Sequence, residues 1–449
     1  MSDLLGIGSS ALAAYRSALS AVGENVANAQ TPGYARRRVV LEELSVAGKG
    51  DIGYRPQMNF NGVIAAGVTR AWDNFKAAEA RFSASADGRA SVRQQWLSGV
   101  ETALDDGISG VGSAMTGFFN TAASLASDPG DTLGRRAVLS ALDNTASAFR
   151  TGGQALGRLA DGIGQAAEIE VASLNDALRA LHAVNGALTP ASANGSARAS
   201  LEDERDRLID FIAGKIDVTV TIGDDGHAGL TATSSASLPL LSGNGPNLTV
   251  LARAADGRLS LQLQTSGTTV PLPAAGGKLA GLVDVAQTVA DRRAALDALA
   301  VDFTAMVNGW SAAGVDANGN PGAALMSAGG GATSIQALAT DPDLVPAASP
   351  GGTANGNLLA LDAIRDSSAV ENRWGALVSA NAQMLASASA EAAATATWRD
   401  NSYAALDEVT GVDLDAEAAD LLRYQQAYSA STRIIQVARE TIQALFDAL

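Results

Sequence analysis

The sequence predicts a mainly α-helical protein with a small β insertion, in which the two ends of the chain pair as a coiled-coil stem. Apolar residues recur every seven positions in both terminal segments, and helical periodicity fills most of the chain between them. Near residue 216 the period switches from helical to two. A chain with a narrow apolar stripe at each end most simply brings its ends together, so that its middle becomes one long insertion.

The first segment, from about Asp3 to Asn28, is predicted to be a helix of this stem. Its stripe has leucine or valine at every seventh position and a second set three residues behind. Proline cannot sit inside a helix and extends the residue before it, so the helix should end near Asn28, ahead of Pro32. The residues that we expect in the assembly interface at this end are Leu5, Leu12, Tyr15, Leu19, Val22 and Val26.

The last segment, residues 410–449, has the same seven-residue spacing and is predicted to be the second stem helix. Acidic residues fill its first turn, where the helix dipole favours them. The interface residues expected here are Leu421, Tyr424, Tyr428, Ile435, Ala438, Ile442 and Leu445. Periodicity alone also fits ordinary amphipathic helices packed on a globular core, so residues 1–35 and 410–449 are a stem only if further signals agree.

Helical patterns predict a trunk over residues 36–215 and 276–409. Trp72, Phe75 and Phe82 lie at helical spacing and are predicted to be core residues, and residues 132–184 are predicted to form long antiparallel rods. From Ile216 apolar residues alternate with polar ones, which predicts an inserted β module over residues 216–275. Residues 311–357, rich in glycine, alanine, asparagine and proline, are expected to be an exposed connector.

Composition excludes several classes of protein. The apolar fraction of 47% with only 4% aromatic residues favours closely packed helices, and the lack of cysteine excludes disulfides and thiolate metal sites. The net charge of -16 argues against nucleic acid or membrane as a partner. The one dense basic run, residues 36–38, is interpreted as a solvated strand surface or as charge facing an acidic neighbouring subunit. We expect neither a membrane span nor a cleavable secretory signal.

Residues suited to catalysis or metal binding are sparse. His182 and His227 are the only histidines, and neither lies in a zinc-protease motif. The glycines of residues 107–112 lack the preceding strand and following lysine of a nucleotide loop. Residues 316–327 begin like a calcium loop, but Pro321 replaces the required glycine and Ser327 the bidentate glutamate, which predicts a turn. We therefore expect no catalytic, cofactor or metal site.

Two motifs at the ends of the chain carry a family resemblance. The run Asn-Val-Ala-Asn-Ala-Gln-Thr-Pro-Gly-Tyr at residues 25–34 closely resembles the N-terminal signature of bacterial flagellar axial proteins, which comprise rod, hook and hook-associated proteins. The run Leu-Leu-Arg-Tyr-Gln-Gln-Ala-Tyr at residues 421–428 resembles their C-terminal signature. Residues 67–70, 201–208 and 313–319 are similar to the hook-associated members that join hook to filament. The matching motif residues are Asn25, Asn28, Thr31, Pro32, Gly33 and Tyr34.

The resemblance implies a secreted structural subunit of the bacterial flagellum that forms the hook–filament junction and is exported by the flagellum's own type III apparatus. Its implied partners are further copies of the chain in a helical lattice, hook protein, the next hook-associated protein, and an export chaperone on the C-terminal helix. Two alternatives stay open. The chain could be another axial protein, such as hook or distal rod, or a wall-remodelling enzyme or adhesin carried on an axial-protein stem.

Overall fold

The structure, a computed structural model, describes residues 2–43, 62–105, 107–192, 195–234, 238–265, 267–273 and 276–447. Long helices dominate it and the sheets are small, which confirms the predicted fold class. The chain forms two compact units. Unit 1 comprises Met1–Ala84, Leu174–Leu248 and Thr397–Leu449, and unit 2 comprises Ser85–Ser173 and Thr249–Ala396. The division into stem, trunk and β module follows other boundaries and stays a prediction.

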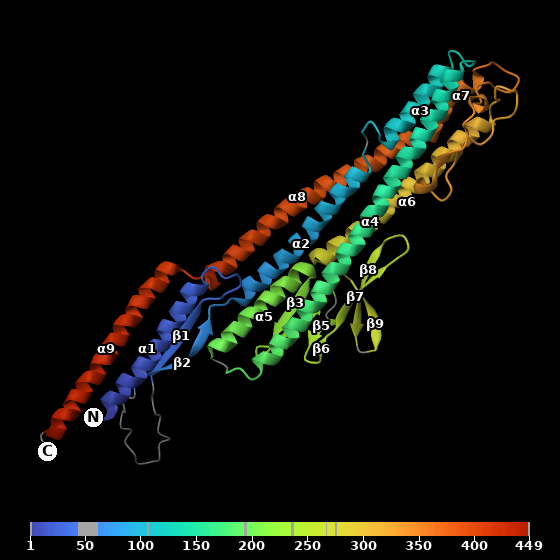
Figure 1. The fold of residues 1–449 in the computed structure, drawn as a ribbon. Helices are drawn as coiled ribbons and strands as arrows, with labels where there is room; N and C mark the ends of the chain where they lie inside the picture. The colour runs from blue at the N-terminus through green and yellow to red at the C-terminus, as the bar shows by residue number, and fades with distance from the viewer. Residues whose placement is uncertain are drawn as a thin grey trace. The chain divides into compact units, whose positions relative to one another are not determined.

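Unit 1 contains both ends of the chain. Helix α1 (Ser2–Asn28) packs against α9 (Leu414–Asp447), as the seven-residue spacing predicts (Figure 1). The approach is close, because a Cβ placed on Gly8 would lie 2.6 Å from Cγ1 of Ile435. Helix α1 also packs on an antiparallel hairpin of β1 (Arg37–Glu43) and β2 (Val63–Arg70), where Ala18 and Ala21 meet Val39. The first helix is therefore held on two sides.

The rest of unit 1 is built around α5 (Ser196–Lys215), which packs beside β2. Strands β3 (Val218–Ile222), β4 (Ala228–Ala232), β5 (Pro239–Ser242) and β6 (Gly245–Pro246) then form an antiparallel sheet in chain order. The switch from helical to alternating periodicity near residue 216 is confirmed. The β residues that follow, in β7 (Leu248–Arg253), β8 (Leu259–Thr265) and β9 (Thr268–Leu272), form a separate three-stranded sheet.

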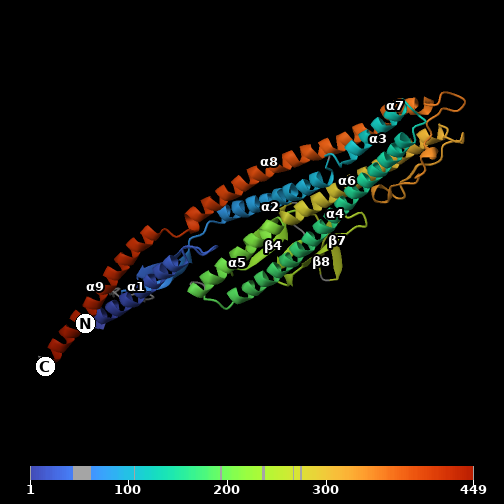
Figure 2. The same ribbon diagram turned by 45° about the horizontal axis from the view of Figure 1, so that its top comes forward.

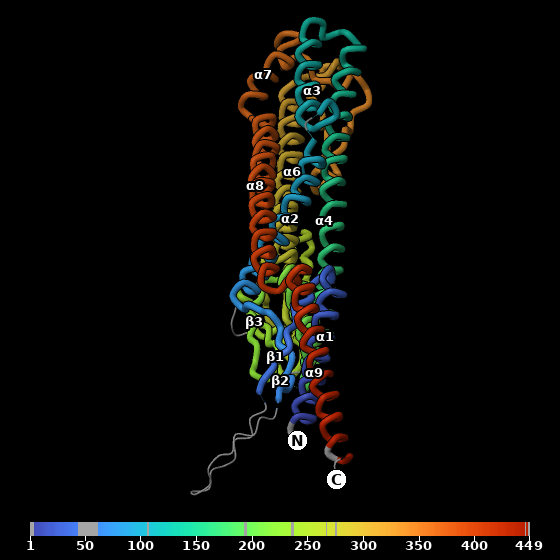
Figure 3. The backbone as a smooth tube through the Cα atoms, turned by 90° about the vertical axis from the view of Figure 1, so that its left-hand side faces the viewer, coloured from blue at the N-terminus to red at the C-terminus, as the bar shows by residue number. Residues whose placement is uncertain are grey.

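Helices α2 (Asn74–Ala103), α4 (Thr132–Leu188) and α8 (Val370–Thr410) contribute residues to both units. Unit 2 adds α3 (Val111–Leu125), α6 (Gly277–Ala312) and α7 (Gly356–Ser368). Figures 2 and 3 follow these helices from two further directions. The core of unit 2 contains a cluster of aromatic rings. In it the Phe118 ring meets the rings of Phe303 and Trp310 edge to face, with ring centroids 5.9 Å and 6.1 Å apart. Edge-to-face pairs add to the stabilisation that burial gives.

Three predictions about the trunk are wrong. Residues 132–184 do not form antiparallel rods, because they lie within the single helix α4. Phe75 and Phe82 are 81% and 52% exposed, because the small residues Ala77 and Ala80 form the face of α2 that packs against Leu406. The expected connector, residues 311–357, is not uniformly exposed. It contains the short elements β10 (Met326–Ser327), η1 (Ala332–Ser334), β11 (Gln336–Ala337) and η2 (Pro342–Leu344). Three of its apolar residues, Leu325, Ile335 and Val345, are fully buried in unit 2.

The turn predicted at residues 316–320 is present. One carboxylate oxygen of Asp316 accepts hydrogen bonds from the backbone N–H groups of Asn318 (2.9 Å) and Asn320 (2.8 Å), and the other accepts one from the Asn320 side chain. Backbone amides hold the pKa of the Asp316 carboxyl below its usual range, with Asn320 the largest contributor. The carboxylate therefore holds its own loop.

Candidate assembly site at the chain termini

The first motif residue, Asn25, is the centre of a buried polar joint. Its side-chain oxygen accepts hydrogen bonds from the Arg37 backbone N–H (2.9 Å) and the Tyr34 hydroxyl (2.8 Å). Its amide nitrogen donates to the Arg37 carbonyl (2.9 Å) and to the Glu417 carboxylate (3.0 Å). These four bonds use the full capacity of an asparagine side chain. Asn25, which is 1% exposed, thus ties the end of α1 to β1 and to the start of α9.

Glu417 brings the C-terminal helix into this joint. It is 1% exposed, and its carboxylate accepts hydrogen bonds from Asn25 and from Nε of Arg36 at 2.6 Å. A guanidinium nitrogen of Arg36 also lies 3.6 Å from Asp420, one turn further along α9. A buried carboxylate is tolerated only when it is paired and hydrogen-bonded. The pairing of Glu417 therefore fixes where α9 meets the segment that follows α1, although Asn25 and Glu417 are 392 positions apart in the sequence.

A ladder of ion pairs joins the same segment to α5. Three arginines from β1, β2 and α2 face aspartates spaced about one turn apart on α5, within residues 203–210. The pairs are Arg37 with Asp203 (2.9 Å), Arg70 with Asp203 (2.8 Å) and Asp206 (2.9 Å), and Arg81 with Asp210 (2.6 Å). The interpretation of residues 36–38 as a solvated surface or a contact to another subunit is wrong for Arg36 and Arg37, because acids of the same chain pair with both.

Burial shapes the electrostatics of this joint. It raises the pKa of Tyr34 to about 12, against the opposing charge of Arg37, so the hydroxyl remains a hydrogen-bond donor to Asn25. The Arg37 guanidinium also lies over the Tyr34 ring, 4.9 Å from its centroid. Burial raises the pKa of the Asp203 carboxyl as well, and outweighs the opposing effect of Arg70 and Arg37. The joint is consequently tight and largely withdrawn from water.

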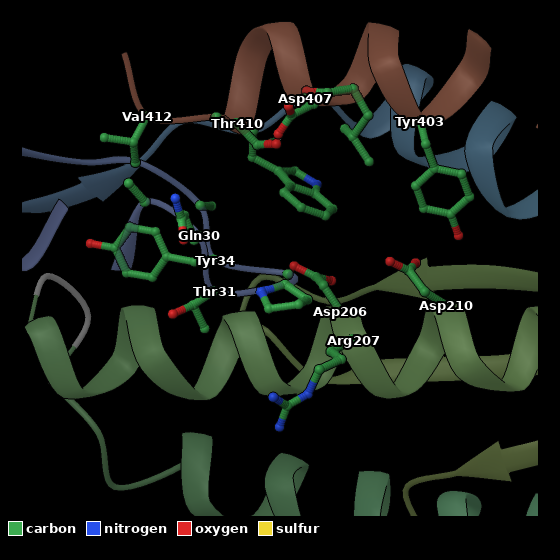
Figure 4. Close-up of a pocket in the computed structure, with 17 residues that line it drawn as sticks. Gln30, Thr31, Tyr34, Asp206, Arg207, Asp210, Tyr403, Asp407, Thr410 and Val412 are labelled. Atoms are coloured by element: carbon green, nitrogen blue, oxygen red, sulfur yellow. Dashed lines mark hydrogen bonds between the residues drawn. The ribbon is translucent and has the colours of Figure 1, made fainter. Parts of the chain in front are cut away.

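The motif residues Thr31, Pro32, Gly33 and Tyr34 form one wall of a cavity of about 290 Å³ (Figure 4). Residues 29–35 line it together with Trp72, side chains of α5, and the end of α8. In Figure 4, Asp206 and Asp210 of α5 point toward the helix that carries Tyr403 and Asp407. Gly33 turns the chain here with a φ of +77°, a value that residues with a side chain rarely adopt. Pro32 and Gly33 thus shape the exit from α1, while Asn28 and Thr31 bond to each other at 3.2 Å.

The expected interface residues of α1 are only partly covered within the chain. Val22 is buried, Leu5, Leu12, Tyr15 and Leu19 are half-buried, and Val26 is exposed. The stripe that faces α9 and the hairpin consists of smaller residues. Gly8 belongs to the second predicted set, whereas the prediction missed Ala11, Ala14, Ala18 and Ala21. Alanine and glycine contribute little to a hydrophobic pattern, and their recurrence at three- and four-residue spacing was the signal that could have found them.

The expected residues of α9 lie closer to its inner face. Ala438 is buried, and Leu421, Tyr424, Ile435 and Ile442 are half-buried. The rings of Tyr15 and Tyr424 lie 6.4 Å apart, so the structure brings these two predicted residues together. Tyr428 is exposed, and the side chain of Leu445 lies outside the described residues. That these positions form an interface between subunits stays a prediction.

Large apolar side chains are exposed at many positions of the terminal pair. Leu422 is 59% exposed and Val437 58% exposed, and six further apolar residues of α1 and α9 are exposed to different degrees. The other members are Leu4, Val26, Leu414, Tyr428, Ile434 and Phe446. We call the surface that these eight exposed residues form around the two helices the outer apolar face. Single exposed apolar residues are ordinary, but this many on two paired helices indicates a surface that packs against another protein.

Comparison with known families assigns the chain. Residues 97–326 match the family model of the flagellar hook-associated protein FlgK helical domain. The chain belongs to the FlgK family. Residues 5–34 also match the model of the flagella basal body rod protein, and residues 405–448 that of the flagellar basal body rod FlgEFG protein C-terminal region. The predicted family resemblance is confirmed, and the terminal matches cover the two helices that form the joint.

Individual FlgK relatives agree. The chain is similar to flagellar hook-associated protein 1 of Escherichia coli (strain K12), with 26% identity over 341 residues, 72% of this chain and 59% of that protein. It is similar to the protein of the same name from Bacillus subtilis (strain 168), with 27% identity over 250 residues, 53% of this chain and 48% of that protein. This chain thus spans about three-fifths of the first relative's length.

A solved FlgK structure shares the fold. The flagellar hook junction protein FlgK from Burkholderia pseudomallei matches with a TM-score of 0.51 and 22% identity, over 56% of this chain and 46% of that one. FlgK-family proteins are structural parts of the flagellum, so the chain is a flagellar component. In the described residues, no helix is long and apolar enough to cross a membrane, and no three His, Cys, Asp or Glu side chains are grouped as a metal site.

Proposed function

We propose that this FlgK-family chain is a structural subunit of the flagellum that forms the junction between hook and filament by self-assembly through its terminal helices. The observation that carries the proposal is the outer apolar face of α1 and α9, on helices that a buried polar joint holds together. The names of its relatives, hook-associated protein 1 and hook junction protein, support the location. The role is one of structure and assembly, without catalysis.

The outer apolar face can supply the driving force for assembly. Burying a large apolar side chain that was exposed contributes about 1.5 to 3 kcal/mol. Eight such side chains would contribute on the order of 10 to 20 kcal/mol, since each is already partly covered, before the costs of association and ordering are subtracted. A contact whose rotation does not close continues as a helical lattice, which lets one kind of subunit extend a tube.

The polar joint fixes the register in which α1 and α9 pair within one chain. A single buried polar residue at a helical seam disfavours every register in which it lacks its partners. Asn25 has all four hydrogen bonds only when Glu417 lies opposite the end of α1. The outer apolar residues of the two helices are then presented in one arrangement. Leu5, Leu12 and the other half-buried seam residues support this pairing from the inside.

The proposed partners follow from the position at the junction. They are further copies of this chain, hook protein below, the next hook-associated protein above, and an export chaperone that covers the C-terminal helix before secretion. Covering α9 would keep Leu422 and Val437 from aggregating inside the cell. The chain would leave the cell through the flagellar type III apparatus and reside outside it.

Electron microscopy of cells that lack this chain tests the proposal, together with a count of filament protein in the medium. We expect complete hooks without filaments, and filament protein released outside the cell. Cells without hooks would instead assign the chain to hook or rod. Normal filaments would contradict an axial role altogether.

A further inference from the structure

A cavity in unit 2 contains an asparagine without hydrogen-bond partners. It measures about 250 Å³ and is lined by Glu101, Leu104 and Asp105 at the end of α2 and by Val378 and Asn381 of α8. Asn381 is 1% exposed, yet neither its amide nitrogen nor its oxygen has a partner among the described residues. Buried polar groups are nearly always hydrogen-bonded. A buried amide that lines a cavity without a hydrogen-bond partner indicates that a polar ligand binds in the cavity.

The charge at this cavity favours a cation. Glu101 and Asp105 are exposed carboxylates, and no ion pair joins either of them to a basic side chain in the described residues. They lie at the C-terminal end of α2, where the helix dipole is negative and the last carbonyl groups lack helical partners. The last turn of α2 contains no basic residue of its own. A positive ligand would thus meet carboxylates outside and an amide oxygen within.

The same lining decides the kind of cation. Calcium and magnesium need about six or more oxygen ligands, and the described residues contain no group of three carboxylate or histidine side chains suited to a metal. Leu104 and Val378 give the cavity apolar walls, which suit the methylene stem of an organic cation. A guanidinium group has five donors in a planar fork and can reach separate acceptors, whereas an ammonium is a compact point charge.

The geometry points to a binding site for an alkylguanidinium cation, the chemistry of an arginine side chain. Its head would donate to the oxygen of Asn381 and to the carboxylates of Glu101 and Asp105, with its stem between Leu104 and Val378. The volume also leaves room for a water molecule to accept from the amide nitrogen. The source would be an arginine of another protein or a free guanidinium compound. This inference is independent of the assembly role, because unit 2 contains every residue involved.

Nuclear magnetic resonance of the full chain with ¹⁵N-labelled asparagine tests the site. The side-chain signal of Asn381 is assigned by its loss in Asn381→Leu, and then followed while acetyl-arginine-methylamide, agmatine or butylamine is added. We expect saturable shifts with the two guanidinium compounds, at a dissociation constant on the order of 1 mM, and roughly tenfold weaker binding of butylamine. Tighter binding of the capped arginine would indicate a protein partner, and tighter binding of agmatine a free compound.

Variants separate this site from general attraction of cations. Replacing both carboxylates, in Glu101→Gln with Asp105→Asn, should weaken binding roughly tenfold. Gln383→Leu, which removes an exposed amide from the same helix, should leave it unchanged. An Asn381 signal that does not move with either guanidinium compound would overturn the proposal. Equal binding of butylamine would also overturn it, as would a response to calcium alone.

Discussion

Replacing Asn25 with alanine should loosen the polar joint far more than its position near a helix end suggests. The change removes four hydrogen bonds, three to neutral groups and one to the Glu417 carboxylate. A neutral hydrogen bond contributes about 0.5 to 1.5 kcal/mol and one to a charged group about 1.5 to 3 kcal/mol. The joint should therefore lose about 3 to 7.5 kcal/mol, and the buried Arg37 backbone groups would be left without partners.

Hydrogen–deuterium exchange measures this loss where it occurs. The terminal helices can open without unfolding the rest of the chain, so a melting temperature alone could miss the effect. Since about 1.4 kcal/mol corresponds to a factor of ten, amides of β1 and of the second half of α1 should exchange at least about a hundredfold faster in Asn25→Ala. Amides of unit 2 should exchange as in the unchanged protein.

Asn28→Ala is the matched control. Asn28 is also a motif asparagine, but its amide donates only to the Glu24 carbonyl within the same helix (2.9 Å) and its oxygen accepts only from exposed Thr31 (3.2 Å). Its replacement should change exchange by less than about tenfold. Exchange that rises equally in the two variants would refute the assignment of Asn25 as the centre of the joint.

Three further changes test other parts of the structure. Gly8→Ala should weaken the packing of α1 on α9 by about 1 to 3 kcal/mol relative to Gly6→Ala, because a Cβ meets Ile435 at position 8 and nothing at position 6; faster exchange around Ile435 would show it, and equal exchange would contradict it. Ala369→Gly should stabilise unit 2 by about 1 kcal/mol, because Ala369 has a φ of 50° between α7 and α8, whereas Ala360→Gly inside α7 should destabilise it by a similar amount; urea unfolding measures both, and a loss of stability in Ala369→Gly would be the contrary result. Burial alone would raise the pKa of the Glu371 carboxyl, but hydrogen bonds from Arg365 and Thr116 and the charge of Arg365 hold it below its ordinary 4.5, so its stabilising effect is complete above pH 4.5 and is lost as the pH falls further. Glu371→Gln should accordingly be less stable than the unchanged protein near neutral pH, with the difference disappearing in acid, and a difference that persists in acid would argue against the ion pair.

The pairing of the two ends could be predicted from sequence because its signals are local. Seven-residue spacing, acids at the start of the last helix and the proline after the first helix all act within a few residues of the feature that they indicate. The inner face of α1 could not be predicted in this way. Its contact with α9 depends on Gly8 and alanines, whose value lies in the close approach that they allow, while Leu5 and Leu12 dominate any hydrophobic pattern.

The polar joint could not be predicted from the sequence for a different reason. Asn25 and Glu417 each resemble ordinary helix-end residues, and only the fold shows that they meet. In the sequence Arg37 likewise resembles a surface charge, and only the fold shows that α5 brings Asp203 beside it. The prediction was wrong for Phe75 and Phe82 because helical spacing shows which residues share a side of a helix, but not which side is buried. Which side is buried depends on the partner helix, and α8 packs against alanines of α2 and leaves Phe75 exposed.

The central claim is that the outer apolar face drives assembly, and complementation of cells that lack the chain tests it most directly. Leu422→Asp with Val437→Asp changes two side chains that are more than half exposed, so the purified variant should unfold at the same temperature as the unchanged protein. Leu359→Asp, at a position 61% exposed on α7, is the control. Counted by electron microscopy, filaments should be absent with the double variant and normal with the control. Normal filaments with the double variant would contradict assembly through this face.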